Sequence, residues 1–181
     1  MSQSTTLTLR ADASARPIAQ VLGMVGFAAL TAAAAQFEIP HYPVPYTLQT
    51  LVVLLSGAFL GKRNAALSQC MYLAAGMSGA PVFSHLGFGL AKILGPTGGY
   101  LLAFPVAAFV IGYLLEGKVN FFRSLVAMTF GLFVIFTLGT LQLYFVYFHN
   151  AGAAIANGFL IFSWWDGVKL LAAAGIASVK R

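Results

Sequence analysis

Asp166 and Lys169 are the residues of this sequence whose types and spacing are best suited to chemistry. They stand three positions apart in an apolar stretch, so on a helix the carboxylate and the ammonium group share one face. Ionisable groups in such a segment are costly to bury and usually face a cavity or a partner. Two interpretations remain open: the pair lines a polar cavity, or it forms a mutual salt bridge or reaches the membrane interface beside Trp164 and Trp165.

Other chemistries lack a matching residue pattern. No Gly-x-x-x-x-Gly-Lys-Ser/Thr phosphate loop occurs, and GPTGG at 95–99 lacks both the spacing and the lysine. Four acids and one cysteine, Cys70, offer neither a proton relay nor a multi-cysteine metal site. An intramembrane hydrolase is disfavoured, because the adjacent side chains of Ser84 and His85 diverge and no Gly-x-Ser-x-Gly motif is present. We therefore expect no catalytic residue, no metal and no cofactor.

The composition indicates a membrane protein. Of the 181 residues, 60% are hydrophobic and only 8% are charged, whereas about a quarter are charged in a soluble domain. So few charges cannot cover the surface, which must then face lipid. The net charge is +6, but the basic residues occur singly or in pairs between apolar stretches. This pattern excludes a nucleic-acid-binding patch and fits basic loops held in the cytoplasm.

The apolar stretches predict an all-α integral membrane protein, a compact bundle of six transmembrane helices with both termini cytoplasmic. The spans are expected near residues 18–37, 47–60, 65–82, 98–115, 125–148 and 163–179, in a single transmembrane domain (1–181) whose residues 1–16 form a cytoplasmic tail. Three prolines in 38–46 favour extended or turn backbone. Arg10 and Arg16 before an apolar run also fit a signal peptide, but the run is long and further spans follow, so we expect a retained helix.

Six spans sort the basic residues eight to two between the two sides of the membrane, as the positive-inside tendency requires. Eight fall on the cytoplasmic side: Arg10, Arg16, Lys62, Arg63, Lys118, Arg123, Lys180 and Arg181. Only Lys92 and Lys169 fall on the outer side. These two exceptions indicate a site that faces outward.

Several polar residues of the outer connections are expected to gather around that site: His41, Tyr42, Tyr46, Ser84, His85, Lys92 and the glycine-rich turn 95–100. The turn opens a helix, and its unpaired N–H groups suit an anion or a carbonyl oxygen. Gln49 adds an amide that would be costly against lipid. The sequence thus predicts a pocket for a small molecule with an acid group at one end and N–H donors at the other.

The first predicted helix offers a second kind of surface. Its small-x-x-x-small patterns allow another helix to approach closely, and they are formed by Ala28, Ala29, Ala32 and Ala33. These alanines either pack inside the bundle or dock a partner. Because the chain has no energy source of its own, transport by it needs a partner or is passive.

Four blocks in order resemble the BioY family: PVPYTLQTL (43–51), GAPVF (79–83), GPTGGYL (95–101) and Asp166-x-x-Lys169. This family comprises the biotin-binding substrate-capture (S) subunits of energy-coupling factor (ECF) transporters. The resemblance implies a compact six-helix protein of the prokaryotic cell (inner) membrane that binds biotin near the outer face. It also implies two kinds of partner, a transmembrane coupling protein (T component) that docks on small residues of the first helix, and cytoplasmic ATPase subunits that use the ATP.

The resemblance further implies roles for individual residues. Ionised Asp166 accepts hydrogen bonds and suits the two N–H groups of the biotin ureido ring, whereas Lys169 suits the ureido carbonyl or a carboxylate. Lys92 is expected at the valerate carboxylate. Four further residues complete the expected biotin site: Gly98, Gly99, Gln49 and Tyr100. Residues 84–88 depart from the glycine-rich stretch expected of the family.

A solitary biotin carrier without an ATPase module is the alternative function. Docking to a coupling protein and transport without one are compatible in a single chain, so the sequence does not separate the two.

Overall fold

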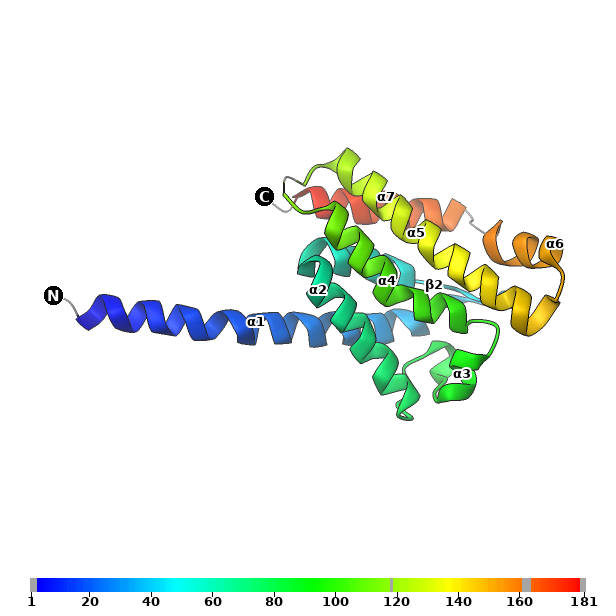
Figure 1. Ribbon diagram of the computed structural model, residues 1–181, viewed down its shortest axis with the longest axis horizontal. Helices are drawn as coiled ribbons and strands as arrows, with labels where there is room; N and C mark the ends of the chain where they lie inside the picture. The colour runs from blue at the N-terminus through cyan, green and yellow to red at the C-terminus, as the bar shows by residue number, and fades with distance from the viewer. Residues whose placement is uncertain (1–2, 118, 161–163, 180–181) are drawn as a thin grey trace.

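The computed structural model describes residues 3–117, 119–160 and 164–179, with side chains from residue 17 onward. The chain is helical apart from one short antiparallel strand pair. Its elements are α1 (Gln3–Gln36), β1 (Glu38–Ile39), β2 (Tyr46–Thr47), α2 (Gln49–Met77), η1 (Ser84–Leu86), α3 (Leu90–Leu94), α4 (Gly98–Leu114), α5 (Phe121–Leu143), η2 (Tyr144–Phe148), α6 (Ala151–Ala154), η3 (Ile155–Phe159) and α7 (Trp164–Val179). In Figure 1, α2, α4, α5 and α7 form one bundle, and α1 extends beyond it.

α2 consists of two helical halves that fold back on each other at Gly61. This residue has φ 74° and ψ 168°, a backbone conformation that glycine adopts readily. A straight helix would separate Gln49 from Tyr72 by about 35 Å at 1.5 Å per residue. Instead, Gln49 Nε2 donates a hydrogen bond of 2.7 Å to Tyr72 Oη. The halves occupy the ranges in which the sequence predicts the second and third spans.

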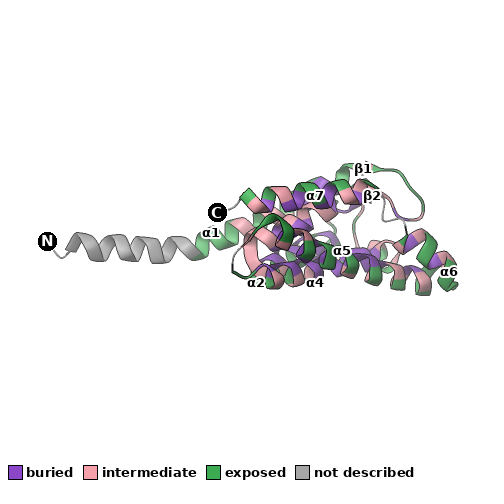
Figure 2. Ribbon diagram, turned by 90° about the horizontal axis from the view of Figure 1, so that it is seen from above, coloured by how far each residue is buried: buried purple, intermediate pink, exposed green. Residues whose placement is uncertain are grey.

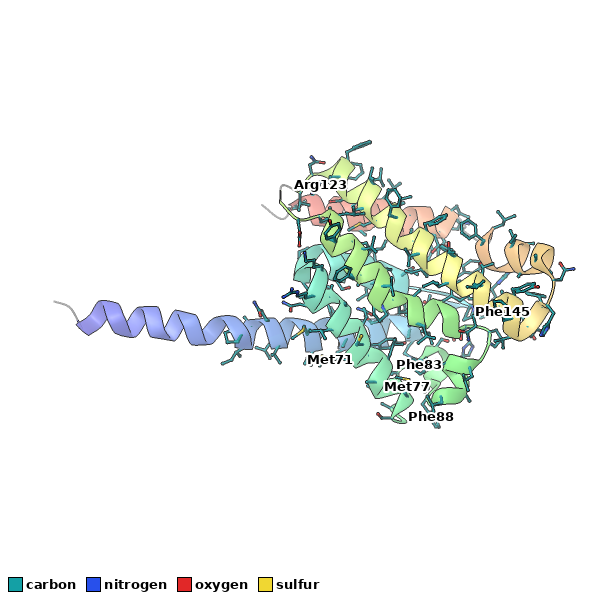
Figure 3. All side chains as sticks on the ribbon, in the orientation of Figure 1. Met71, Met77, Phe83, Phe88, Arg123 and Phe145 are labelled. Atoms are coloured by element: carbon teal, nitrogen blue, oxygen red, sulfur yellow. The ribbon has the colours of Figure 1, made fainter. Side chains whose placement is uncertain are left out.

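The connection between α4 and α5 is fixed by Arg123. Asn120 caps α5 by accepting a 2.8 Å hydrogen bond from Arg123 N. The Arg123 guanidinium in turn donates to the carbonyls of Leu114 (3.0 Å) and Glu116 (2.6 Å) at the end of α4. Figure 3 shows Arg123 at one end of α5 and Phe145 beyond the other. The helix begins at Phe121, earlier than the predicted 125, because the charge of Arg123 is satisfied by backbone carbonyls instead of facing lipid.

Buried polar side chains connect α1 to both halves of α2. Gln69 Nε2 donates to Thr31 Oγ1 at 3.3 Å and to Ser56 Oγ at 3.4 Å, and all three side chains are fully buried. One position before Gln69, Ser68 Oγ donates to the carbonyl of Met24 at 2.8 Å. In a membrane interior such hydrogen bonds between helices hold them together, because lipid offers the polar groups no alternative partner.

The bundle is apolar both inside and outside. Buried residues concentrate where α4, α5 and α7 meet (Figure 2), and the core includes Ile111, Met128 and Ile135. Large apolar side chains such as Phe130 and Phe133 are exposed on α5. An exposed apolar belt over a packed apolar core is typical of a surface that faces lipid.

Among the described residues, two helical segments are long and apolar enough to cross a membrane, Pro17–Gln36 and Phe121–Phe148. A third is added if Ala151–Phe159 and Trp164–Val179, bent by 48°, count as one span. α4 and each half of α2 are shorter than the roughly 20 residues of a straight span. The count of six spans and the cytoplasmic location of both termini therefore stay predictions.

The two ends of the bundle carry different connections. In Figure 1 the bend of α2 and the α4–α5 connection lie at the end where α7 finishes, whereas β2, α3 and α6 lie toward the opposite end. Residues 3–16 of the predicted cytoplasmic tail are helical, because α1 begins at Gln3 and continues through Pro17. Of the basic residues assigned to the cytoplasmic side, Lys118, Lys180 and Arg181 lie outside the described residues, as do the side chains of Arg10 and Arg16.

Candidate functional site

Asp166 and Lys169 lie one turn apart on α7 and are both buried, with 3% and 4% of their surface exposed. Lys169 Nζ is 2.6 Å from Asp166 Oδ1. The side chain of Lys169 is therefore buried and paired inside the bundle, which leaves the cavity and the mutual salt bridge as the interpretations that the structure supports. The pair in fact does both, because it forms a salt bridge and also lines a cavity.

Lys169 also ties α7 to the start of α2. Its ammonium group donates to Thr47 O at 3.0 Å and to Thr50 Oγ1 at 2.6 Å, in addition to Asp166. An ammonium group has three N–H donors, so the protein itself engages all three. In this state Lys169 holds Asp166 in place and has no N–H left for a ligand carbonyl or carboxylate, the role that the family resemblance gives it.

Gln49 connects the same region to the second half of α2. Its Nε2 donates to Tyr72 Oη at 2.7 Å, and its Oε1 accepts from Thr47 Oγ1 at 3.0 Å. Tyr72 Oη extends this series of hydrogen bonds by donating one of 3.3 Å to Val82 O. Gln49 thus lies in the expected site, within a buried hydrogen-bond network whose members hold one another in position.

These side chains open into a cavity of about 60 Å³, called here the inner cavity. It is lined by Val44, Pro45, Tyr46, Thr47, Gln49, Thr50, Ser84, Thr97, Tyr100, Leu101, Phe104, Ile135, Phe136, Asp166 and Lys169. Four residues of the expected site therefore meet here: Asp166, Lys169, Gln49 and Tyr100. The ring of Tyr100 lines the cavity, while its hydroxyl donates to Gly158 O at 2.9 Å.

Lys92 does not line the inner cavity but a neighbouring space of about 590 Å³, called here the outer cavity. Pro45 and Thr97 line both cavities, so the two adjoin. His41, Tyr42 and His85 also line the outer cavity. The single outward-facing pocket that the sequence predicts is thus divided in two, with the acid–amine pair inside and Lys92 outside.

Gly98 and Gly99 lie outside the residues that line either cavity. A Cβ on Gly98 would stand 1.6 Å from Ile93 O, and one on Gly99 would stand 2.5 Å from Leu138 O. Helix packing thus accounts for both glycines, because the start of α4 lies directly against the backbone of α3 and α5. A close approach of their backbone to a ligand has no support in this arrangement.

The sequence does not predict the apolar wall of the inner cavity. Phe104 of α4 and Ile135 and Phe136 of α5 form it. The ring of Phe136 meets Tyr100 edge-on at 6.2 Å, and Phe104 stacks on Tyr72 at 6.5 Å. Sixteen phenylalanines occur in the chain, and no local pattern separates those that line a cavity from those that face lipid.

The alanines of α1 fall on two faces of the helix. Ala28 and Ala32 are half-buried and pack against the core, whereas Ala29 and Ala33 are exposed. Only the second pair is therefore available to a helix from another protein. Packing inside the bundle thus accounts for Ala28 and Ala32, and docking of a partner on Ala29 and Ala33 stays a prediction.

Comparison with known proteins identifies the family. Residues 3–181 match the BioY family. The chain is 44% identical to the biotin transporter BioY of Thermotoga maritima and 43% identical to the probable biotin transporter BioY of Pyrococcus horikoshii, in both cases over 83% of this chain and 89% of the relative. Its fold resembles the crystal structure of the S-component for biotin from an ECF-type ABC transporter, with TM-score 0.83, 24% identity and 90% of each chain covered.

The family relationship and the apolar helices agree on the location of the chain. It is a multi-pass protein of the cell membrane. The match spans nearly the whole chain and includes the α7 pair, both halves of α2 and the turn before α4. The chain therefore belongs to the BioY family, as the four sequence blocks predict.

Proposed function

We propose that this chain binds biotin and serves its uptake as the S component of an ECF-type importer. The observation that carries the proposal is the buried Asp166–Lys169 pair at a cavity in a chain of the BioY family. A relative at 44% identity is a biotin transporter, and the structural neighbour is an S-component for biotin.

The two adjoining cavities suit the two ends of biotin. The ureido ring offers two N–H donors, for which the Asp166 carboxylate is an acceptor. The valerate tail ends in a carboxylate, and Lys92 in the outer cavity supplies a cation for it. Rings of Tyr100, Phe104 and Phe136 supply the apolar surface that a small-molecule site needs around a few polar groups.

Binding requires the inner cavity to widen. Its volume of about 60 Å³ is well below the roughly 300–1,000 Å³ of typical ligand pockets. The outer cavity of about 590 Å³ adjoins it at Pro45 and Thr97. In our proposal these two residues move apart as the ring enters, and the two cavities become one site.

The proposed partners are a transmembrane T component and cytoplasmic ATPase subunits. The exposed pair Ala29 and Ala33 on α1 is the proposed docking surface for the T component, because small residues let another helix approach closely. In this proposal ATP is used by the ATPase subunits, and this chain needs no cofactor of its own. The alternative is a solitary biotin carrier that needs neither partner.

A biotin titration of the purified protein, read by the fluorescence of Trp164 and Trp165, tests the proposed ligand. We expect saturable binding; a folded protein that shows no fluorescence change and retains no labelled biotin would exclude biotin. Uptake of labelled biotin by cells that express this chain with and without the T component and ATPases separates the two functions. Uptake that depends on the partners supports the S component, and equal uptake without them supports the solitary carrier.

A further inference from the structure

Ser84 has a buried hydroxyl that the protein leaves unused. The residue is 5% exposed and lines the inner cavity. Five buried polar residues line this cavity, and four of them, Gln49, Tyr100, Asp166 and Lys169, make side-chain hydrogen bonds or ion pairs. Among the described residues, no group forms a hydrogen bond with the Ser84 hydroxyl. This oxygen is therefore free to meet whatever enters the cavity.

The Ser84 hydroxyl also remains open to the cavity. Three buried side-chain oxygens of the described residues are sealed off without a partner, namely Glu38 Oε2, Ser124 Oγ and Thr140 Oγ1. Ser84 Oγ is not one of them, since it keeps contact with the cavity space. A buried donor without a partner costs free energy in the empty state, and an acceptor oxygen on a ligand would remove that cost.

The backbone on both sides of Ser84 is fixed. Phe83 is fully buried, its ring lies 5.5 Å from that of Tyr72, and its carbonyl accepts from Gln36 Nε2 at 3.0 Å. Backbone hydrogen bonds pair Phe83 with Gly87 in both directions, at 3.0 and 3.2 Å. Figure 3 shows Phe83 beside the end of α2. The backbone that carries this hydroxyl is already ordered before a ligand binds. Binding therefore costs little free energy for ordering this segment.

Ser84 and Asp166 supply opposite halves of a hydrogen-bond pattern. Asp166 when ionised only accepts, whereas a serine hydroxyl can donate. The three donors of Lys169 are engaged by Asp166, Thr47 and Thr50. A ureido ring presents N–H donors and one carbonyl acceptor, so it needs a donor from the protein besides the carboxylate.

The geometry points to Ser84 as the specificity-determining donor to the ureido carbonyl of biotin, with Asp166 accepting from the ureido N–H. This inference rests on the proposed function and adds to it the residue that donates a hydrogen bond to the carbonyl oxygen. Lys169 is then a positioning residue for Asp166 and for the start of α2.

Biotin titrations of purified variants test the assignment. Ser84→Ala is expected to weaken biotin binding about tenfold, the loss of one buried hydrogen bond. Ser84→Thr keeps the hydroxyl and retains most of the affinity, and Ser84→Cys, a weaker donor, lies between. Ser78→Ala is the matched control, because Ser78 is exposed and bonds only within its own helix, to Ala74 O at 2.7 Å; its affinity should stay within about twofold.

An analogue with sulfur in place of the ureido oxygen identifies the ligand atom. The wild-type protein should lose affinity for this analogue, and Ser84→Ala should lose much less. An equal loss in both proteins overturns the assignment, as does an unchanged biotin affinity of Ser84→Ala. If Ser84→Ala does not fold, the Thr and Cys variants decide by the same comparison. Wild-type protein that binds neither compound refutes the proposed function itself, whereas normal binding by every Ser84 variant refutes only the role of Ser84.

Discussion

Lys169 Nζ lies 2.6 Å from Asp166 Oδ1 on the same face of α7, and both side chains are buried. The ammonium group also holds Thr47 and Thr50, so one lysine joins α7, the β2–α2 junction and the proposed biotin acceptor. Removing either charge therefore has two separable effects, one on binding and one on stability.

Asp166→Asn is expected to weaken biotin binding about 10- to 100-fold. The amide offers one acceptor oxygen in place of two and presents N–H groups to the ureido N–H donors, and a hydrogen bond to a charged group is worth more than a neutral one. Titration of the purified variants measures this loss. Glu116→Gln is the matched control, because Glu116 is exposed and pairs with Lys62. Equal affinities of the two variants would contradict the proposed site.

Lys169→Met is expected to destabilise the folded protein by about 3–5 kcal/mol, because the Asp166 carboxylate stays buried without its counter-charge. Adding Asp166→Leu should restore much of the stability, since the buried pair is then replaced by apolar groups. Biotin binding should stay lost in the double variant. Thermal unfolding in detergent and a biotin titration provide the two readouts. A double variant less stable than Lys169→Met alone would argue against this account.

Gly98→Ala is expected to destabilise the fold by about 1–3 kcal/mol, the usual cost of forcing an extra group into a packed site. Its Cβ would meet the backbone oxygen of Ile93, which cannot rotate away as a side chain does. Gly175→Ala on α7 is the control, because nothing lies within 4 Å of its Cβ position. Thermal unfolding compares them, and similar melting temperatures would show that α4 does not require glycine here.

Ala29→Leu is expected to prevent co-purification with the T component while biotin binding stays intact. A larger side chain on the exposed face of α1 keeps a second helix from approaching closely. Ala172→Leu is the control, because Ala172 is equally an exposed helical alanine but belongs to α7 and not to the proposed docking helix. Loss of the partner in both variants, or in neither, would remove α1 as the docking helix.

The sequence correctly predicts those parts of the candidate site that depend only on the spacing of residues within one helix. Asp166 and Lys169 are three residues apart, and helix geometry alone places them on one face. Gln49 and Tyr100 also lie at the same cavity as expected, since each sits at the start of a predicted span. Family membership follows from the sequence as well, because the four blocks are specific and in order.

The sequence does not predict those features of the site that depend on how the helices pack against one another. Lys92 lies in a separate cavity because the position of α3 relative to β1 and β2 is set by tertiary contacts. The rotation of α1 about its axis decides which alanines face outward. Four identical alanines do not indicate that rotation in the sequence. Gly98 and Gly99 allow α4 to pack closely against α3 and α5. The local sequence does not show that these contacts require glycine.

The α7 ion pair has a consequence for the electrical behaviour of the protein. Its charges cancel, so a reorientation of the bundle in the membrane displaces no net charge from this part of the site. A lone lysine that crossed the membrane would couple to the voltage by about 2.3 kcal/mol per 100 mV. Because Lys169 carries its own counter-ion, the membrane potential does far less work on this pair than on a lone lysine, since only the short dipole between the two charges turns in the field.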